Sequence, residues 1–170
     1  MRYYITITLI AVLITSGCSV INITKTPDYN TYIGKTFSQY SELTGMAHQQ
    51  GKVLTKSTGK EYALMVFKKD KHYVVFMDEI IRNKGNIKYK IIDCMVISKL
   101  KKKEEIILEC LLKGKPDDEI FCIAKCDEKE RTEKEYFELI IKAWRADKKK
   151  RKINEMDVEN VKAFNYDFGV

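Results

Sequence analysis

The chain reads Tyr62-Ala63-Leu64-Met65-Val66-Phe67, then Lys68-Lys69-Asp70-Lys71, then His72-Tyr73-Val74-Val75-Phe76-Met77. The two outer stretches are apolar, aromatic or β-branched at nearly every position, a composition that favours β-strands. The four polar residues between them have the length of a hairpin connection. The sequence therefore predicts an antiparallel hairpin over residues 62–77, with a mainly β fold around it.

More strands are predicted on both sides of this hairpin, joined by turns that contain Gly, Pro, Asn or Asp. The clearest is a second hairpin, in which residues 89–97 run into a lysine-rich turn and residues 105–111 return. Residues 48–52 are polar and are expected to form a loop. The fold class that follows is an antiparallel meander sheet, or a small barrel or sandwich. Shorter predicted strands lie at 53–55, 120–124, 153–156 and 161–165.

A helix competes with a strand over residues 133–146. Thr132-Glu133-Lys134-Glu135 has the capping-box pattern of a helix start, and the apolar residues that follow can share one helical face. An α+β fold with a helix at about 133–146 is therefore an alternative. The same region also reads as a strand over 138–146, a charged turn and a returning strand, and we favour this second interpretation.

The first eighteen residues have the layout of a secretory signal peptide. Arg2 is followed by an apolar run from Tyr3 to Ile14, and Ser16-Gly17-Cys18 comes soon after. The run is too short for a membrane-spanning helix, which needs about 20 apolar residues. Ser16-Gly17-Cys18 resembles the lipobox of bacterial lipoproteins, although Thr15 stands where that family usually has Leu.

This resemblance implies that the chain is cut before Cys18 and that the Cys18 sulfur carries a diacylglyceryl group. It also implies a location in the bacterial cell envelope, at the outer membrane facing the periplasm, with membrane lipid as a partner and no nucleic acid. Residues 1–17 would be the signal peptide, 18–32 a lipidated tether and 33–170 a single β-rich domain. That domain would begin with a short helix that ends at Gly45. Removal of the signal peptide lowers the formal charge from +7 to +6, since Arg2 is the only charged residue removed.

Four further cysteines lie in the predicted β region: Cys94, Cys110, Cys122 and Cys126. Two interpretations are open, because buried thiols pack as small hydrophobic groups and exported proteins also keep disulfides. Folding the predicted hairpins about their turns places Cys94 opposite Cys110, and Cys110 opposite Cys122. No metal is expected, because Cys122 and Cys126 are not at the close spacing of a zinc site and both histidines are far away in the sequence.

Two lysine-rich tips are the most unusual polar features of the chain. They can be solvated turns whose like charges discourage edge pairing. They can also form a surface for an anionic partner, such as lipid headgroups, an acidic envelope polymer or an acidic protein. The first tip contains Lys99, Lys101, Lys102 and Lys103, and the second contains Lys148, Lys149, Lys150, Arg151 and Lys152.

Catalytic motifs are missing from the sequence, which has no Gly-rich phosphate loop, no His-Glu-x-x-His and no Gly-x-Ser-x-Gly. We therefore expect no enzyme and no cofactor, but a lipid-anchored envelope protein that acts as a non-catalytic binding module. Ile141–Asp147 with the following lysine-rich turn resembles a motif of small uncharacterised bacterial envelope proteins, which implies no activity. One alternative is a periplasmic immunity- or inhibitor-type lipoprotein that neutralises an acidic protein. Another is a small enzyme with no recognisable motif, for example one using a Cys94–His72 pair.

Overall fold

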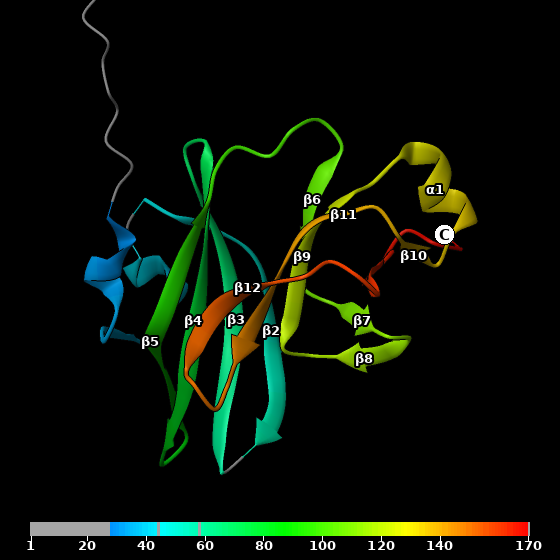
Figure 1. Ribbon diagram of the computed structural model, residues 1–170. Coiled ribbons are helices and arrows are strands. Elements are labelled where there is room, and N and C mark those ends of the chain that lie inside the picture. Colours follow the sequence, from blue (N-terminus) through cyan, green and yellow to red (C-terminus); the bar gives the residue numbers. More distant parts are fainter. Residues whose placement is uncertain (1–27, 44, 58, 170) are drawn as a thin grey trace, which may run out of the picture.

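The structure, a computed structural model, describes residues 28–43, 45–57 and 59–169. The predicted signal peptide and the lipidation site at Cys18 lie outside these residues. Within them, thirteen strands form three antiparallel sheets, which we call A, B and C (Figure 1). The predicted mainly β fold class is confirmed.

Sheet A has five strands in the order β1-β5-β4-β3-β2. The hairpin predicted over 62–77 is present as β3 and β4, in which Phe67 lies opposite Val74. The four strands β2 to β5 follow one another as a meander, and β1 adds to the free side of β5. The bounds are β1 Thr36–Phe37, β2 Ala47–Ser57, β3 Lys60–Lys69, β4 His72–Asn83 and β5 Asn86–Ile97.

The prediction of a loop at residues 48–52 is wrong, because these residues belong to the edge strand β2. Their polar side chains find partners beyond the sheet: Gln50 Nε2 donates to the Ile106 carbonyl at 2.7 Å, and Lys52 Nζ donates to the Leu108 carbonyl at 3.0 Å. Gly51 leaves room for Met65, whose Sδ would lie 2.5 Å from any Cβ added there. A polar composition therefore did not prevent a strand at this edge.

Sheet B has the order β12-β11-β9-β6, and sheet C has the order β10-β13-β7-β8. The hairpin predicted between 89–97 and 105–111 is wrong, since β5 pairs with β4 and β1, whereas β6 pairs with β9. Residues 98–103 cross from sheet A to sheet B instead of turning back. The bounds are β6 Glu104–Ile107, β7 Cys110–Leu112, β8 Lys115–Asp117, β9 Ile120–Lys125, β10 Tyr136–Phe137, β11 Ile140–Asp147, β12 Lys152–Met156 and β13 Val161–Phe164.

The helix considered at 133–146 is not formed, and the strand interpretation is confirmed. The short helix α1, Glu128–Glu133, ends where that helix would have begun. The strands β11 and β12 form a hairpin in which Asp147 lies opposite Lys152. A strand buries the apolar residues of this segment well, because sheet B is covered on both faces. Ala143 lies in one core and Trp144 lies in the other.

Three hydrophobic cores hold together the layers that Figure 1 shows as ribbons. The first core lies between sheets A and B, where Leu64 and Val75 meet Phe121 and Trp144. The second lies between sheets B and C and contains the cysteines Cys110, Cys122 and Cys126. The third lies on the outer face of sheet A, under the N-terminal segment. Sheets A and B therefore form the predicted sandwich, with a further cover on each outer side.

The N-terminal cover is built from short turns. Residues Tyr29–Tyr32 form the 3-10 helix η1, and Tyr29 is only 2% exposed, so the tether predicted over 18–32 does not extend to these residues. The short helix expected before Gly45 is present as one 3-10 turn, η2, Tyr40–Glu42. The Glu42 carboxylate stabilises its start by accepting hydrogen bonds from the Ser38 and Gln39 amides at 2.7 and 2.8 Å.

A carboxyl group is buried in the third core. Asp78 in β4 is fully buried, and both of its carboxylate oxygens lack a hydrogen-bond partner among the described residues. Its neighbours across the sheet are Ala63 and Ile91, which are apolar. Burial without a partner disfavours the charged form and raises the pKa of Asp78 to about 7.

We predict that Asp78 makes the protein less stable as the pH rises from about 5 to about 8. Between the ordinary pKa of 3.8 and the raised pKa of about 7, the folded state binds more protons than the unfolded state. The free energy of unfolding therefore falls with pH in this range, by a contribution on the order of 4 kcal/mol at most.

Urea unfolding of the native chain and of Asp78→Asn at pH 5 and pH 8 measures this contribution. The amide side chain of the variant cannot ionise, so the variant should gain stability relative to the native chain as the pH rises. An equal change with pH in both proteins would contradict the prediction.

Candidate functional site

The first lysine-rich tip is the loop 98–103 that crosses from β5 to β6. Leu100 packs against the first core and fixes the middle of the loop. The Glu104 carboxylate accepts the Lys101 amide at 2.8 Å and closes the turn. Lys99, Lys101 and Lys102 are exposed. The loop is thus anchored by its apolar residue and presents its lysines to solvent.

The turn between β3 and β4 lies beside this loop. Lys68, Asp70 and Lys71 line a hollow of about 220 Å³ together with Lys99 and Leu100. The Lys68 ammonium lies 5.5 Å from the centre of the Tyr73 ring, a cation–π distance. The predicted pairing of residues 89–97 with 105–111 did not place these lysines beside the first tip, whereas in the structure β5 pairs with β4 and Tyr73 lies opposite Ile97.

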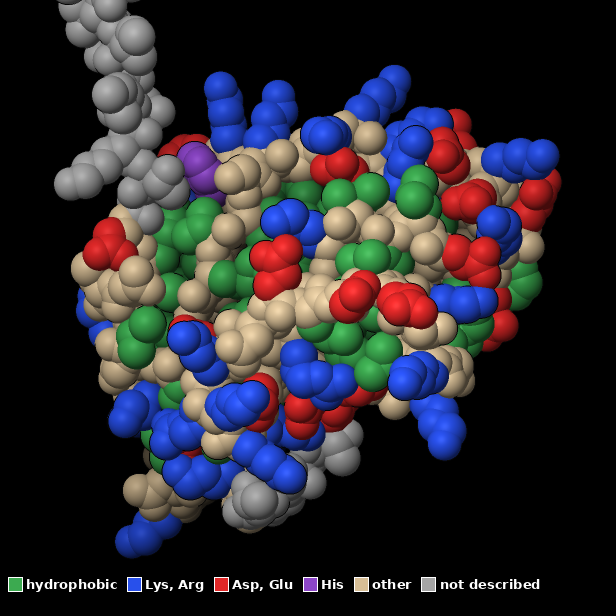
Figure 2. Space-filling model, in the orientation of Figure 1, with side chains coloured by type: hydrophobic (Ala, Val, Ile, Leu, Met, Phe, Trp, Pro, Cys, Tyr) green, Lys and Arg blue, Asp and Glu red, His purple; other side chains and the backbone are tan. Residues whose placement is uncertain are grey.

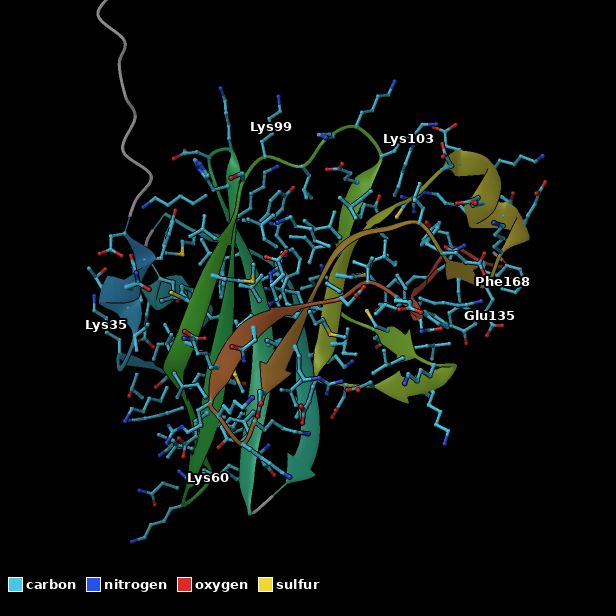
Figure 3. All side chains as sticks on the ribbon, in the orientation of Figure 1. Lys35, Lys60, Lys99, Lys103, Glu135 and Phe168 are labelled. Carbon is cyan, nitrogen blue, oxygen red and sulfur yellow. The ribbon has the colours of Figure 1, made fainter. Side chains whose placement is uncertain are left out.

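We call this surface the basic end and define it by five exposed lysines that form no ion pair with any described residue: Lys68, Lys71, Lys99, Lys101 and Lys102. Figure 2 shows Lys and Arg side chains projecting along this edge, at the top of the view. Lys103 lies on the same loop (Figure 3) but is engaged by the Asp127 carboxylate. Their hydrogen bond raises the pKa of Lys103 and lowers that of Asp127.

The second lysine-rich tip lies at the opposite end of the molecule. Glu79 accepts hydrogen bonds from both Lys60 and Arg151 at 2.7 Å, which places this tip at the end marked by Lys60 in Figure 3. Lys148 is buried against Asp118 and Glu119 at 3.6 and 3.2 Å. The structure therefore does not join the two predicted tips into one surface.

Most charges of the second tip are engaged within the protein. Lys150 lies 3.5 Å from Asp147, and the Asp147 carboxylate also accepts the amides of Lys149 and Lys150. Only Lys149 and Lys152 of this tip have no ion-pair partner among the described residues. The second tip thus stabilises the β11–β12 turn and is a weaker candidate for binding an anion than the basic end.

An apolar groove of about 320 Å³ adjoins the basic end, between β5 and sheet B. Its floor includes Ile123, Ile141 and Trp144, and it shares Lys99 and Leu100 with the hollow described above. The Trp144 ring stacks on Phe121 with 5.4 Å between ring centres and is mostly buried. A partner that contacts the lysines could therefore also place an apolar group in this groove.

A second hollow, of about 440 Å³, lies between β2 and sheet C. Among the polar groups that line it, Lys52 is hydrogen-bonded to a main-chain carbonyl, and Asp117 is paired with Arg145 at 2.7 Å. Cys110 also lines this hollow and is itself buried. Because Lys52 and Asp117 are already engaged, neither is free to act as an acid or base here.

The cysteines divide between two cores. Cys94 lies opposite Phe76 and packs against the third core, so the pairing of Cys94 with Cys110 predicted from the wrong hairpin is not possible. Cys110 of β7 and Cys122 of β9 have their Sγ atoms 3.6 Å apart in the second core. All four cysteines of the β region are free thiols in the structure, and Cys110, Cys122 and Cys126 are buried.

None of the thiols for which a pKa shift is found is activated as a nucleophile. Burial is the main cause that raises the pKa of Cys94 to about 11 and that of Cys126 to about 12. The hydrogen bond with Cys110, followed by burial, raises the pKa of Cys122. His72 lies four residues along β4 from the position opposite Cys94, about 13 Å away at the strand rise, so the proposed Cys94–His72 pair is wrong.

The comparisons with known proteins add no assignment. Neither a family model, nor a curated protein, nor a solved structure matches the chain. Within residues 28–43, 45–57 and 59–169, no group of three His, Cys, Asp or Glu side chains is arranged to hold a metal ion. In the same part of the chain, no helix has the length and hydrophobicity needed to span a membrane.

We predict that a disulfide formed in the folded domain joins Cys110 to Cys122. Their sulfur atoms are already in contact, whereas Cys94 lies on the far side of sheet A. Refolding with oxidised glutathione supplies the oxidant, and peptide mapping without reductant identifies the pair. The Cys94→Ala variant should give the same linked peptides, and a major linked peptide containing Cys94 would contradict the prediction.

We also predict that Lys148 stabilises the fold and does not serve binding. Lys148→Gln leaves Asp118 and Glu119 without this partner and should lower the free energy of unfolding by about 1–3 kcal/mol. The neighbouring exposed substitution Lys149→Gln should change it by less than about 0.5 kcal/mol. Urea unfolding compares the two variants, and equal effects would contradict a structural role that is specific to Lys148.

Proposed function

We propose that this chain is a lipid-anchored protein of the bacterial cell envelope, held through Cys18, whose β domain is a non-catalytic binding module. The location is supported by the apolar leader and by Ser16-Gly17-Cys18, which resembles a lipobox. Each buried methylene of an acyl chain contributes about 0.8 kcal/mol, so that two chains are enough for stable anchoring. The domain would face the periplasm from the outer membrane.

The observation that supports a binding role is the contrast between the two ends of the domain. The basic end has five exposed lysines without ion-pair partners among the described residues, whereas Lys148, Lys150 and Arg151 of the second tip are paired with carboxylates. Unpaired lysines at one surface attract an anionic partner, and this attraction weakens with salt. The partner class is therefore anionic: lipid headgroups, an acidic envelope polymer or an acidic protein.

A second candidate function is that of a periplasmic immunity- or inhibitor-type lipoprotein that neutralises an acidic protein. The apolar groove beside Lys99 favours this candidate, because protein interfaces usually combine a buried apolar anchor with charged residues at the rim. Capture of the native protein from its own membrane in mild detergent tests it. One acidic protein bound in equal amount would support this candidate over a lipid or polymer partner.

We predict that the mature chain begins at Cys18 and has the mass of a diacylglyceryl-modified protein. Intact-protein mass spectrometry of the native protein from membranes measures both properties. Cys18→Ala should abolish the acyl mass and the cleavage together, because the thiol is the group that is modified. The matched control Cys94→Ala should leave both unchanged, and a native chain that begins at Met1 without acyl mass would contradict the anchor.

A further inference from the structure

The position where the N-terminal segment joins the domain determines which surface can face the anchor. Tyr32 in η1 packs on Phe76 with 6.0 Å between ring centres, and the Asn30 side chain lies 3.6 Å from the Cys94 sulfur. Both contacts fall on the halves of β4 and β5 that lead to the β3–β4 turn and to the loop 98–103. The blue segment in Figure 1 lies beside β5 accordingly.

The causes of two pKa shifts agree with this position of the segment. After burial, the carboxylate of Asp70 in the β3–β4 turn is the next cause that raises the pKa of Tyr29. Asp28 similarly contributes, after burial and Asp93, to the raised pKa of Cys94. Together with the contacts of Tyr32 and Asn30, these causes agree with a position of the first described residues on the side of sheet A that leads to the β3–β4 turn.

The tether limits how far the domain can move from the membrane. Asp28 lies ten positions after Cys18, so the chain between them can span at most about 33–36 Å. A charge is attracted to an anionic surface only within about a Debye length, near 8 Å at physiological salt. An anchor that joins the domain beside the basic end repeatedly brings those lysines into this range.

We propose that the basic end docks on the anionic headgroups of the same bilayer that holds the anchor, with its five lysines facing the lipid phosphates. This inference rests on the proposed function, because it requires the lipid at Cys18. Asp70 and Glu104 lie among these lysines, whereas the nearby Glu105 and Asp127 are already paired with Arg131 and Lys103. Five lysines against two carboxylates therefore leave a charge of +3. Leu100 is partly buried and packs against the first core, so docking is electrostatic and does not insert the loop into the acyl region.

Amine-reactive footprinting of the lipidated full-length mature protein tests this proposal. The protein is incorporated into vesicles of phosphatidylcholine alone, or with about one third phosphatidylglycerol, which gives the negative surface potential of an anionic membrane. The five lysines of the basic end should be protected only in the anionic vesicles. Lys84, Lys149 and Lys152, exposed away from the basic end, should stay reactive in both. Salt at about 1 M, where the Debye length is about 3 Å, should remove the protection.

Two matched variants separate docking from simple proximity. Lys99→Gln, Lys101→Gln and Lys102→Gln combined should weaken docking on the order of 100-fold, at about five-fold per lysine, and should expose Lys68 and Lys71 to the reagent. The control variant with Lys84, Lys149 and Lys152 each changed to Gln removes the same charge and should leave the protection unchanged. Circular dichroism confirms that both variants fold like the native protein.

The failure of this inference differs from the failure of the anchor. A protein without acyl mass that does not enter either kind of vesicle would refute the proposed function. A protein that enters both kinds of vesicle but shows the same lysine reactivity in each would overturn the docking inference alone. Protection that requires an added acidic membrane protein would overturn it as well, and would favour the protein partner.

Discussion

Side chains on both faces of β3 and β4 are withdrawn from water, and the rest of the structure depends on this constraint. Leu64 and Val66 face sheet B, whereas Ala63 and Phe67 face the N-terminal segment. A sheet with two apolar faces needs a cover on each face, because exposed apolar area is unfavourable. In sheet B, successive side chains of β9 point alternately into the first and the second core, and sheet C covers the second face of sheet B. The order of the layers follows from these requirements.

Because both faces of these strands are buried, charged side chains gather at the strand ends. The two ends of the domain differ in how these charges are paired. At one end Lys148 and Arg151 are engaged with carboxylates, and such pairs tie β11 and β12 to their neighbours. At the other end the five lysines of the basic end are exposed and form no ion pair with any described residue. A paired lysine offers little to a ligand, whereas a solvated one keeps its full charge for a partner. This difference between the two ends indicates which end of the domain would face the membrane of the proposed anchor.

Local sequence pattern predicted most strands but not their partners. The hairpin over 62–77 and the turn between β11 and β12 form from adjacent residues, so composition and turn length were sufficient to find them. The segment 105–111 was assigned to the wrong neighbour because its apolar residues fit more than one sheet. In the structure β6 pairs with β9 in sheet B, whereas β7 pairs with β13 and β8 in sheet C. The strand at 48–52 was missed because its polar side chains are satisfied by carbonyls distant in the sequence.

The candidate site was predicted in part. The first lysine-rich tip was identified from sequence, but Lys68 and Lys71 lie beside it through the pairing of β4 with β5, which was not predicted from the sequence. The pairing of Lys148 with Asp118 and Glu119 also links residues about thirty positions apart, which no local pattern reveals. The proximity of Cys110 and Cys122 was anticipated, although the two strands face each other across a core and are not neighbours in one sheet.

Native-state hydrogen exchange, read residue by residue, tests the double burial of β3 and β4 most directly. Because these strands are covered on both faces, their amides should exchange only through global unfolding and should be the slowest in the domain. Amides of the edge strands β1 and β8 should exchange by local opening and much faster. Amides of β3 and β4 that exchanged as fast as those of the edge strands would contradict the layered core.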